Sequence, residues 1–208
     1  ALELSCFDSG IFVYIPKNII IDEPIRIIDV LAPDGTSSIT RNIVIAESNS
    51  KASIVQELYS NKQSDDKIQQ SLFELLECYV GANARLDFVT LQAMNEKNSV
   101  NFSNRKAFIE KDAKMSWYMG LFGGQLSRYK IDNIMKGEGA SAEDVEIIFG
   151  INDQSFDVTS NLIHYGPNTR GRVLSKSVMK DHSKSLFKGM IKIDKNGKSA
   201  ESFLAGHA

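Results

Sequence analysis

Cysteine is scarce in this sequence of 208 residues, which contains two, Cys6 and Cys78. The two cysteines lie far apart and form no CxxC pair. A disulfide framework or a four-ligand zinc site needs more cysteines, or closely spaced ones. Because free cysteine usually behaves as a small hydrophobic residue, we expect two isolated, partly buried thiols.

Long apolar runs and an excess of one charge are also missing. No window approaches about 18 consecutive apolar residues, so no transmembrane helix is expected. The N-terminal residues ALELS lack the basic stretch and apolar core of a signal peptide, which makes a cytoplasmic setting the default. The net charge is −2, whereas nucleic-acid-binding domains are typically basic. We therefore expect neither a membrane nor a nucleic-acid partner.

Short stretches of alternating apolar and polar residues fill most of the chain, and this period of two predicts β-strands. Residues 65–77 could also form a helix, although the continuation to Val80 suits a strand. The apolar faces predicted from the alternation are Ile19, Ile21, Ile25 and Ile27; Ile43 and Ile45; Ile54 and Leu58; Leu86 and Phe88; Met115, Trp117, Met119 and Leu121; Val145, Ile147 and Phe149; and Phe156, Val158 and Leu162.

Small polar clusters recur between these strands. They occupy residues 49–52, 81–84, 111–114, 137–140, 168–171 and 195–198. The first five are about 30 residues apart, a period typical of solenoids. Gly, Asn and Asp tolerate the tight turns that such a coil needs. The pattern favours a parallel β-helix about as strongly as it favours a β-sandwich or barrel, which also have many short strands.

One of these clusters matches a nucleotide-binding pattern. Residues 137–142, GEGASA, fit GxGxxA. That loop binds a pyrophosphate only where a helix follows it. The next stretch, residues 144–149, alternates as a strand, so a coil corner is the better interpretation.

The residues give little sign of a catalytic or metal site. The three histidines, His164, His182 and His207, form no HxH, HExxH or HxxxH pair. His164 shares the apolar face of its strand and is expected to be buried and hydrogen-bonded, and His182 is expected on the surface. Acidic residues are assigned to outward positions, which leaves no paired carboxylates. No catalytic residue is therefore predicted, and only His164 and Cys78 are kept as candidates for metal binding.

Several stretches, taken in order, resemble the core of the SufB/SufD family, the scaffold subunits of the SUF iron–sulfur cluster assembly machinery. No single motif is diagnostic, but the ordered set covers nearly the whole chain. The stretches are IFVYIPKNIIIDEPIRI from Ile11, RNIVIAESNSKASIVQELYS from Arg41, MSWYMGLFGGQLSRYKIDNIMKGEGASAE from Met115 and IHYGPNTRGRVLSKSVMKDHSKSLFKGMIKI from Ile163.

The resemblance implies an all-β, right-handed parallel β-helix, with residues 1–208 forming a single core domain that lacks the family's terminal helical regions. It implies a scaffold and not an enzyme. It also implies pairing with a SufB-like paralogue, as a homo- or heterodimer, and docking of a SufC-like ABC ATPase. An Fe–S cluster is expected only in the assembled complex. Because the open end of a β-helix is prone to unwanted pairing, a partner or flanking residues should cap it.

The branch of the family depends on one position. SufB-type chains carry a cysteine just before a Ser-x-Leu-x-Gly stretch, which resembles residues 202–206 here, and the cysteine's position falls at or near Ala200. Alanine cannot ligate iron or accept sulfur, since both need a thiolate. We therefore expect a SufD-like chain. Two alternatives are a SufB-type scaffold that binds a cluster directly, using Cys78 and His164, and a β-helical carbohydrate-active protein.

Overall fold

The computed structural model describes residues 6–31, 35, 37–60 and 67–208, and in them it is an all-β solenoid built from two parallel sheets. One sheet has the order β1 (Phe12–Ile15), β3 (Ser37–Ala46), β5 (Gln70–Val80), β7 (Ser99–Ile109), β9 (Leu126–Met135), β11 (Ser155–His164) and β13 (Lys184–Ile193). The other has the order β2 (Ile25–Val30), β4 (Lys51–Tyr59), β6 (Arg85–Ala93), β8 (Lys114–Leu121), β10 (Ser141–Gly150), β12 (Arg170–Met179) and β14 (Glu201–His207). We call them the odd and the even sheet.

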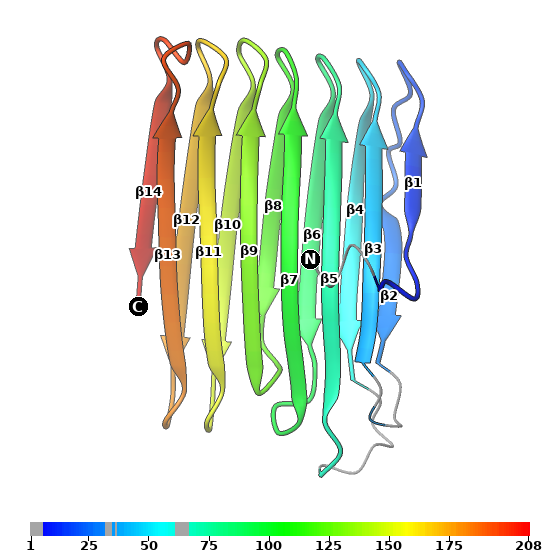
Figure 1. The fold of residues 1–208 in the computed structure, drawn as a ribbon, viewed down its shortest axis with the longest axis vertical. Helices are drawn as coiled ribbons and strands as arrows, with labels where there is room; N and C mark the ends of the chain where they lie inside the picture. Colours follow the sequence, from blue (N-terminus) through cyan, green and yellow to red (C-terminus); the bar gives the residue numbers. More distant parts are fainter. Residues whose placement is uncertain (1–5, 32–34, 36, 61–66) are drawn as a thin grey trace.

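Each turn of the coil adds one strand to each sheet. In Figure 1 the odd strands run upward in front, the even strands run downward behind them, and successive turns advance from right to left. This path makes the coil right-handed, as predicted. The described residues contain no helix that could cross a membrane. The helical alternative for residues 65–77 is wrong where the structure describes them, because β5 begins at Gln70; residues 65 and 66 lie outside the described part.

The corners confirm the recurrence seen in the sequence. The first five predicted clusters each contain one residue with positive φ, and a sixth such residue, Ser199, directly follows the last cluster. Asn and Gly adopt this left-handed conformation at the lowest steric cost. The residues and their φ angles are Asn49 (60°), Asn83 (59°), Asp112 (54°), Gly139 (68°), Asn168 (57°) and Ser199 (57°).

The corner residues also bond to one another from turn to turn. The Asn83 side-chain amide donates to Asn49 Oδ1 at 3.2 Å, and the Asn49 amide donates to Asn18 Oδ1 at 2.8 Å. Backbone N–H groups continue the ladder, as when Asn83 donates to the carbonyl of Lys111 at 2.8 Å. The recurrence in the sequence therefore reflects stacked copies of one turn.

The core lies between the two sheets, and most of the predicted inward faces are confirmed. On β8, Met115, Trp117 and Leu121 are fully buried. The same holds for Phe88 on β6, whose ring centroid lies 5.3 Å from that of Trp117. Large aromatic and aliphatic side chains of successive turns thus stack into a main core, beside a second, smaller cluster of Leu31, Leu58, Leu72 and Met94.

On two strands the inward face is the opposite of the predicted one. The prediction is wrong for Val145, Ile147 and Phe149 on β10 and for Ile43 and Ile45 on β3, all of which face outward. On β10 the inward positions belong to Asp144 and Glu146, both fully buried. The reason is register: Asp144 pairs with Trp117 of the neighbouring strand, so it shares the inward face of Trp117. The apolar content of β10 alone pointed to the opposite face.

Candidate functional site

His164, the last residue of β11, is fully buried and bonded through both ring nitrogens. Nδ1 lies 2.8 Å from Thr169 Oγ1, and Nε2 lies 2.6 Å from Ser202 Oγ. The Thr169 hydroxyl donates to the carbonyl of Gly166 at 3.2 Å, so it accepts from Nδ1–H. Nε2 then accepts from Ser202. Burial lowers the pKa of His164, so the ring is held neutral, with its tautomer fixed by two hydroxyl groups.

Cys78 lies on β5 and is fully buried in the apolar core. Burial raises the pKa of its thiol, which disfavours the thiolate needed for metal binding. In the odd sheet, three strand spacings separate β5 from β11, about 14 Å. The structure therefore does not bring Cys78 and His164 together. Among the described residues no three His, Cys, Asp or Glu side chains converge as metal ligands would.

A buried ion pair, which the sequence did not reveal, occupies the interior between β5 and β7. Arg105 and Glu74 are both fully buried, and the Arg105 guanidinium donates to Glu74 Oε2 at 2.9 and 3.0 Å. Two further N–H groups of Arg105 donate to Thr90 Oγ1 at 2.6 Å and to Gln56 Oε1 at 2.9 Å. Every nitrogen of the guanidinium thus has an acceptor.

Glu74 is held ionised by its surroundings. Burial by itself would raise the pKa of its carboxyl group, but the Arg105 charge and the hydrogen bonds from Gln56 and Ser103 outweigh burial, and the pKa is lowered. The Gln56 amide donates to Oε1 at 2.7 Å and the Ser103 hydroxyl to Oε2 at 2.9 Å. We call Glu74, Arg105, Gln56, Thr90 and Ser103 the paired-charge cluster.

Three aromatic rings surround the Arg105 guanidinium. Its central carbon lies 5.2 Å from the ring centroid of Tyr129, 5.5 Å from that of Phe88 and 5.7 Å from that of Trp117. Cation–π attraction is strongest where the cation is desolvated. The rings therefore stabilise the buried charge from the faces that its hydrogen bonds leave open.

A second polar cluster lies further along the interior and contains two carboxyl groups that have no cation beside them among the described residues. Asn133 donates to both Asp144 oxygens, at 2.9 and 3.0 Å, while its own oxygen accepts from Trp117 Nε1 at 3.0 Å. Ser160 donates to Glu146 Oε1 at 2.5 Å, and Glu146 Oε2 has no partner among the described residues. We call Asp144, Glu146, Asn133 and Ser160 the acid cluster.

The acid cluster shifts its carboxyl groups the opposite way from Glu74. Burial, and then the neighbouring Glu146, raises the pKa of Asp144 well above its ordinary value. Burial also raises the pKa of Glu146, against the opposing effect of the Ser160 hydrogen bond. Without a cation to compensate desolvation, a buried carboxyl group takes up a proton instead.

Register carries the signal that would have found these clusters. Asp144 and Glu146 pair with Trp117 and Met119, whose inward orientation the sequence did predict. Arg105 likewise lies on the same face of β7 as Ala107 and Ile109, both of which are fully buried. Stacking the repeat of about 30 residues before assigning faces would have placed all three inside.

The last described turn exposes side chains that earlier turns cover. On β13, Ile191 and Ile193 share the inward parity but are 41% and 53% exposed. In the described structure β13 pairs with β11 alone, and β14 pairs with β12 alone. This turn thus presents apolar side chains and free strand edges along the axis of the coil.

The family follows from comparison with known proteins. A model described as "SUF system FeS cluster assembly, SufBD core domain" matches residues 30–208. The chain belongs to the SufBD family. The family prediction is thereby confirmed, and the parallel solenoid described above is the form that the SufBD core takes in this chain.

The SufBD chain is similar over nearly its whole length to staphylococcal proteins named as iron–sulfur cluster assembly SufBD family proteins. It is 26% identical over 203 residues to one from Staphylococcus epidermidis strain ATCC 12228 and to one from Staphylococcus aureus strain USA300. Each alignment covers 97% of this chain and 43% of the relative. The chain therefore spans less than half the length of these relatives.

Proposed function

We propose that this chain is the β-helical core of a non-enzymatic, cytoplasmic scaffold subunit of a SUF-type complex. The subunit pairs with a SufB-like paralogue and works with a SufC-like ATPase. The observation that carries the proposal is the match of the SufBD core model to residues 30–208. The match covers the interior polar clusters and the last turn.

The geometry supports a scaffold that acts by association. His164 is neutral and uses both ring nitrogens internally, and Cys78 is a buried thiol with a raised pKa. Apolar side chains instead lie exposed at the last turn, where a second core can pack and extend both sheets. We place the paralogue there, and we assign any Fe–S cluster to the assembled complex.

The branch is proposed to be SufD-like. Ala200 occupies the position where the SufB-type cysteine is expected, directly before β14. Direct cluster binding by Cys78 and His164 would need both side chains at one metal centre, which the separation of β5 and β11 opposes. Carbohydrate chemistry is opposed by the burial of Asp144 and Glu146, since no polysaccharide could reach them.

Co-purification tests the proposal directly. The full-length parent protein is co-expressed with SufB-like and SufC-like subunits, and the expected result is a stable complex in size-exclusion chromatography. Failure of the unsubstituted protein to associate would overturn the scaffold role.

Two matched variants then locate the contact. Ile191→Lys places a charge in the exposed inward row of β13, whereas Met190→Lys places it on the outer face of the same strand, at a residue that is 46% exposed. We expect the first variant to lose at least about tenfold in affinity, because a lysine in the inward row would be buried without a partner in the joined core, and the second to retain binding, because its lysine stays in solvent. Equal binding by both variants would remove the contact from this turn while leaving the scaffold role intact.

A further inference from the structure

The outer face of the even sheet carries an apolar patch that the pairing of cores does not use. It is a grid of nine outward positions, of which eight are uncharged, over β8 with the residue that follows it, β10 and β12. The rows follow from the strand register, with Ile147 between Gly120 and Lys176, and Val145 between Tyr118 and Leu174. The nine positions of this apolar grid are Tyr118, Gly120, Phe122, Val145, Ile147, Phe149, Leu174, Lys176 and Val178.

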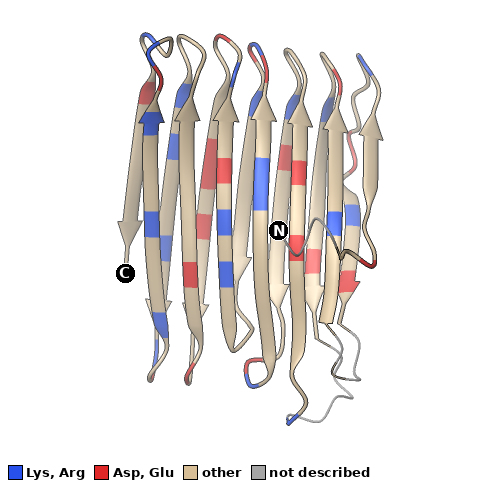
Figure 2. Ribbon diagram, viewed as in Figure 1, with Lys and Arg blue, Asp and Glu red and all other residues tan. Residues whose placement is uncertain are grey.

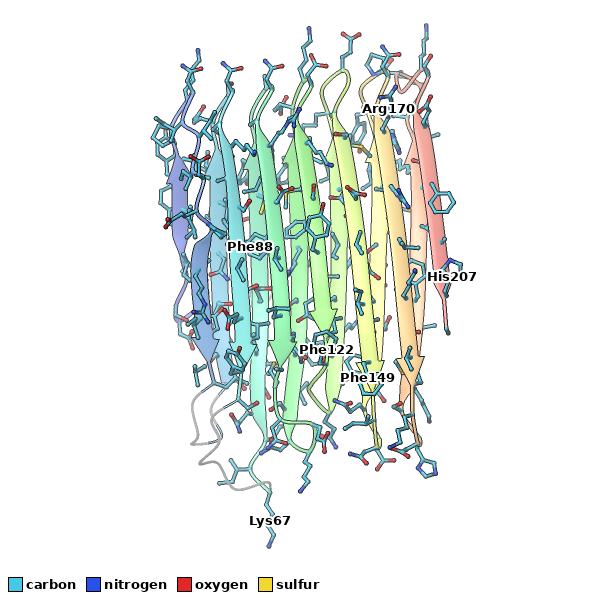
Figure 3. All side chains as sticks on the ribbon, turned by 180° about the vertical axis from the view of Figure 1, so that it is seen from behind. Lys67, Phe88, Phe122, Phe149, Arg170 and His207 are labelled. Carbon is cyan, nitrogen blue, oxygen red and sulfur yellow. The ribbon has the colours of Figure 1, made fainter. Side chains whose placement is uncertain are left out.

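The large side chains of the grid are open to solvent. Phe122 is 44% exposed, Ile147 53%, Phe149 43% and Val178 62%. Figure 3, which views the molecule from behind, shows Phe122 and Phe149 close together on the lower part of this face, in line with the pairing of Leu121 with Ile148. Contiguous exposed apolar residues mark interaction sites more often than scattered ones do.

The outer face of the odd sheet differs at the corresponding level. Its central positions carry Glu77, Lys106 and Asp132 side by side in register on β5, β7 and β9. Figure 2 shows both red and blue segments along the front strands. This row of the odd face therefore carries three charges, whereas the apolar grid on the even face carries one.

Three positively charged residues lie along β12, within the apolar grid or beside it. Lys176 lies within the grid, and Arg172 and Lys180 lie near the two ends of the same strand. All three are exposed, and none forms an ion pair with another described residue. Arg172 instead lies over the Phe203 ring, with 5.9 Å between its guanidinium carbon and the ring centroid. A partner with carboxylates along this side would match them.

We propose that the apolar grid docks an amphipathic helix of a partner protein, with its apolar stripe on β10 and acidic residues facing β12. The dimensions fit a single helix. The grid spans about 10 Å across three strands and about 14 Å along them, and a helix is about 10 Å wide and covers that length in about nine residues. This contact goes beyond the pairing of cores, because it lies on the flank of the coil and not at its end.

Two synthetic peptide probes test the proposal with the full-length parent protein. Both are labelled amphipathic helices with the same Leu/Phe stripe, one flanked by Glu and the other by Lys. Fluorescence anisotropy is expected to show at least about tenfold tighter binding of the acidic peptide, with a preference that weakens at high salt. Binding of neither peptide, or equal binding of both, would overturn the proposal.

Matched variants test whether the acidic peptide binds at the apolar grid. Ile147→Glu is expected to weaken the acidic peptide at least about tenfold, while Leu186→Glu, at a residue 50% exposed on the odd face, leaves it unchanged. Lys176→Glu is expected to reverse the preference between the two peptides. If the parent protein instead self-associates through this face and Ile147→Glu abolishes self-association, the occupant is a second copy and the proposal fails. None of these outcomes depends on co-purification with a SufB-like subunit.

Discussion

The two polar clusters inside this solenoid both bury a carboxyl group, and they shift its pKa in opposite directions. In the paired-charge cluster, Glu74 stays ionised because Arg105 lies against it, and its pKa is lowered. In the acid cluster, Asp144 has a carboxyl neighbour and no cation within the described part of the chain, and its pKa is raised. Both sites are fully buried and built from strands of the same type. The difference shows that the neighbouring charged side chains, not the depth of burial, decide the direction of the pKa shift.

The largest effect is expected where a charge loses its partner. Arg105→Met leaves the buried Glu74 carboxylate uncompensated, which typically costs about 3–5 kcal/mol of unfolding free energy. Urea unfolding measures the loss. The double variant Arg105→Met/Glu74→Leu should recover most of it, because neither charge then remains buried. A double variant no more stable than Arg105→Met would show that the pair itself, and not its imbalance, holds the fold.

A smaller loss of stability is expected in the acid cluster, because a substitution there leaves no buried charge without its partner. Asn133→Leu removes the acceptor of Trp117 Nε1 and the donor to Asp144. Leaving these groups unsatisfied costs about 1–3 kcal/mol. The same unfolding experiment applies. A loss as large as that of Arg105→Met would mean that Asp144 is ionised and depends on Asn133 as its main stabilising partner.

The smallest effect is expected at the periphery of the acid cluster. Ser160→Ala removes one hydrogen bond to Glu146, at a cost of about 1 kcal/mol. Ser116→Ala is the matched control, because Ser116 is equally buried but its hydroxyl has no partner among the described residues. Equal stability of the two variants would show that the bond to Glu146 contributes nothing.

Local pattern predicted the coil but not its polar interior. The corner clusters at residues 49–52 and 81–84 were readable because a left-handed turn restricts residue type at one position. The inward face of β8 could be predicted because it carries Met115 and Trp117, whereas the opposite face carries the more polar Lys114 and Ser116. On β10, however, Ile147 and Phe149 are more apolar than Asp144 and Glu146, and only pairing with β8 sets the orientation.

The candidate site was predictable to a similar degree. The burial and hydrogen bonding of His164 followed from its parity within β11. Its partners did not, since Ser202 lies 38 residues away on β14. Arg105 and Glu74 are likewise 31 residues apart. Contacts made by stacking successive turns become visible only once the register is known, and single strands do not reveal it.

The opposite ionisation of Glu74 and Asp144 is the central claim, and the pH dependence of unfolding for Asp144→Asn tests it most directly. Because the pKa of Asp144 is raised on folding, the native state holds a proton that the unfolded state releases above its ordinary pKa of about 4. Wild-type stability should therefore lose a contribution as the pH rises from that value toward the folded-state pKa, by about 1.4 kcal/mol for each pH unit. The Asp144→Asn variant cannot lose this contribution, so its stability relative to the wild type should increase as the pH rises above about 5, until the pH passes the folded-state pKa of Asp144. A difference between the two proteins that stays constant over this range would contradict the claim.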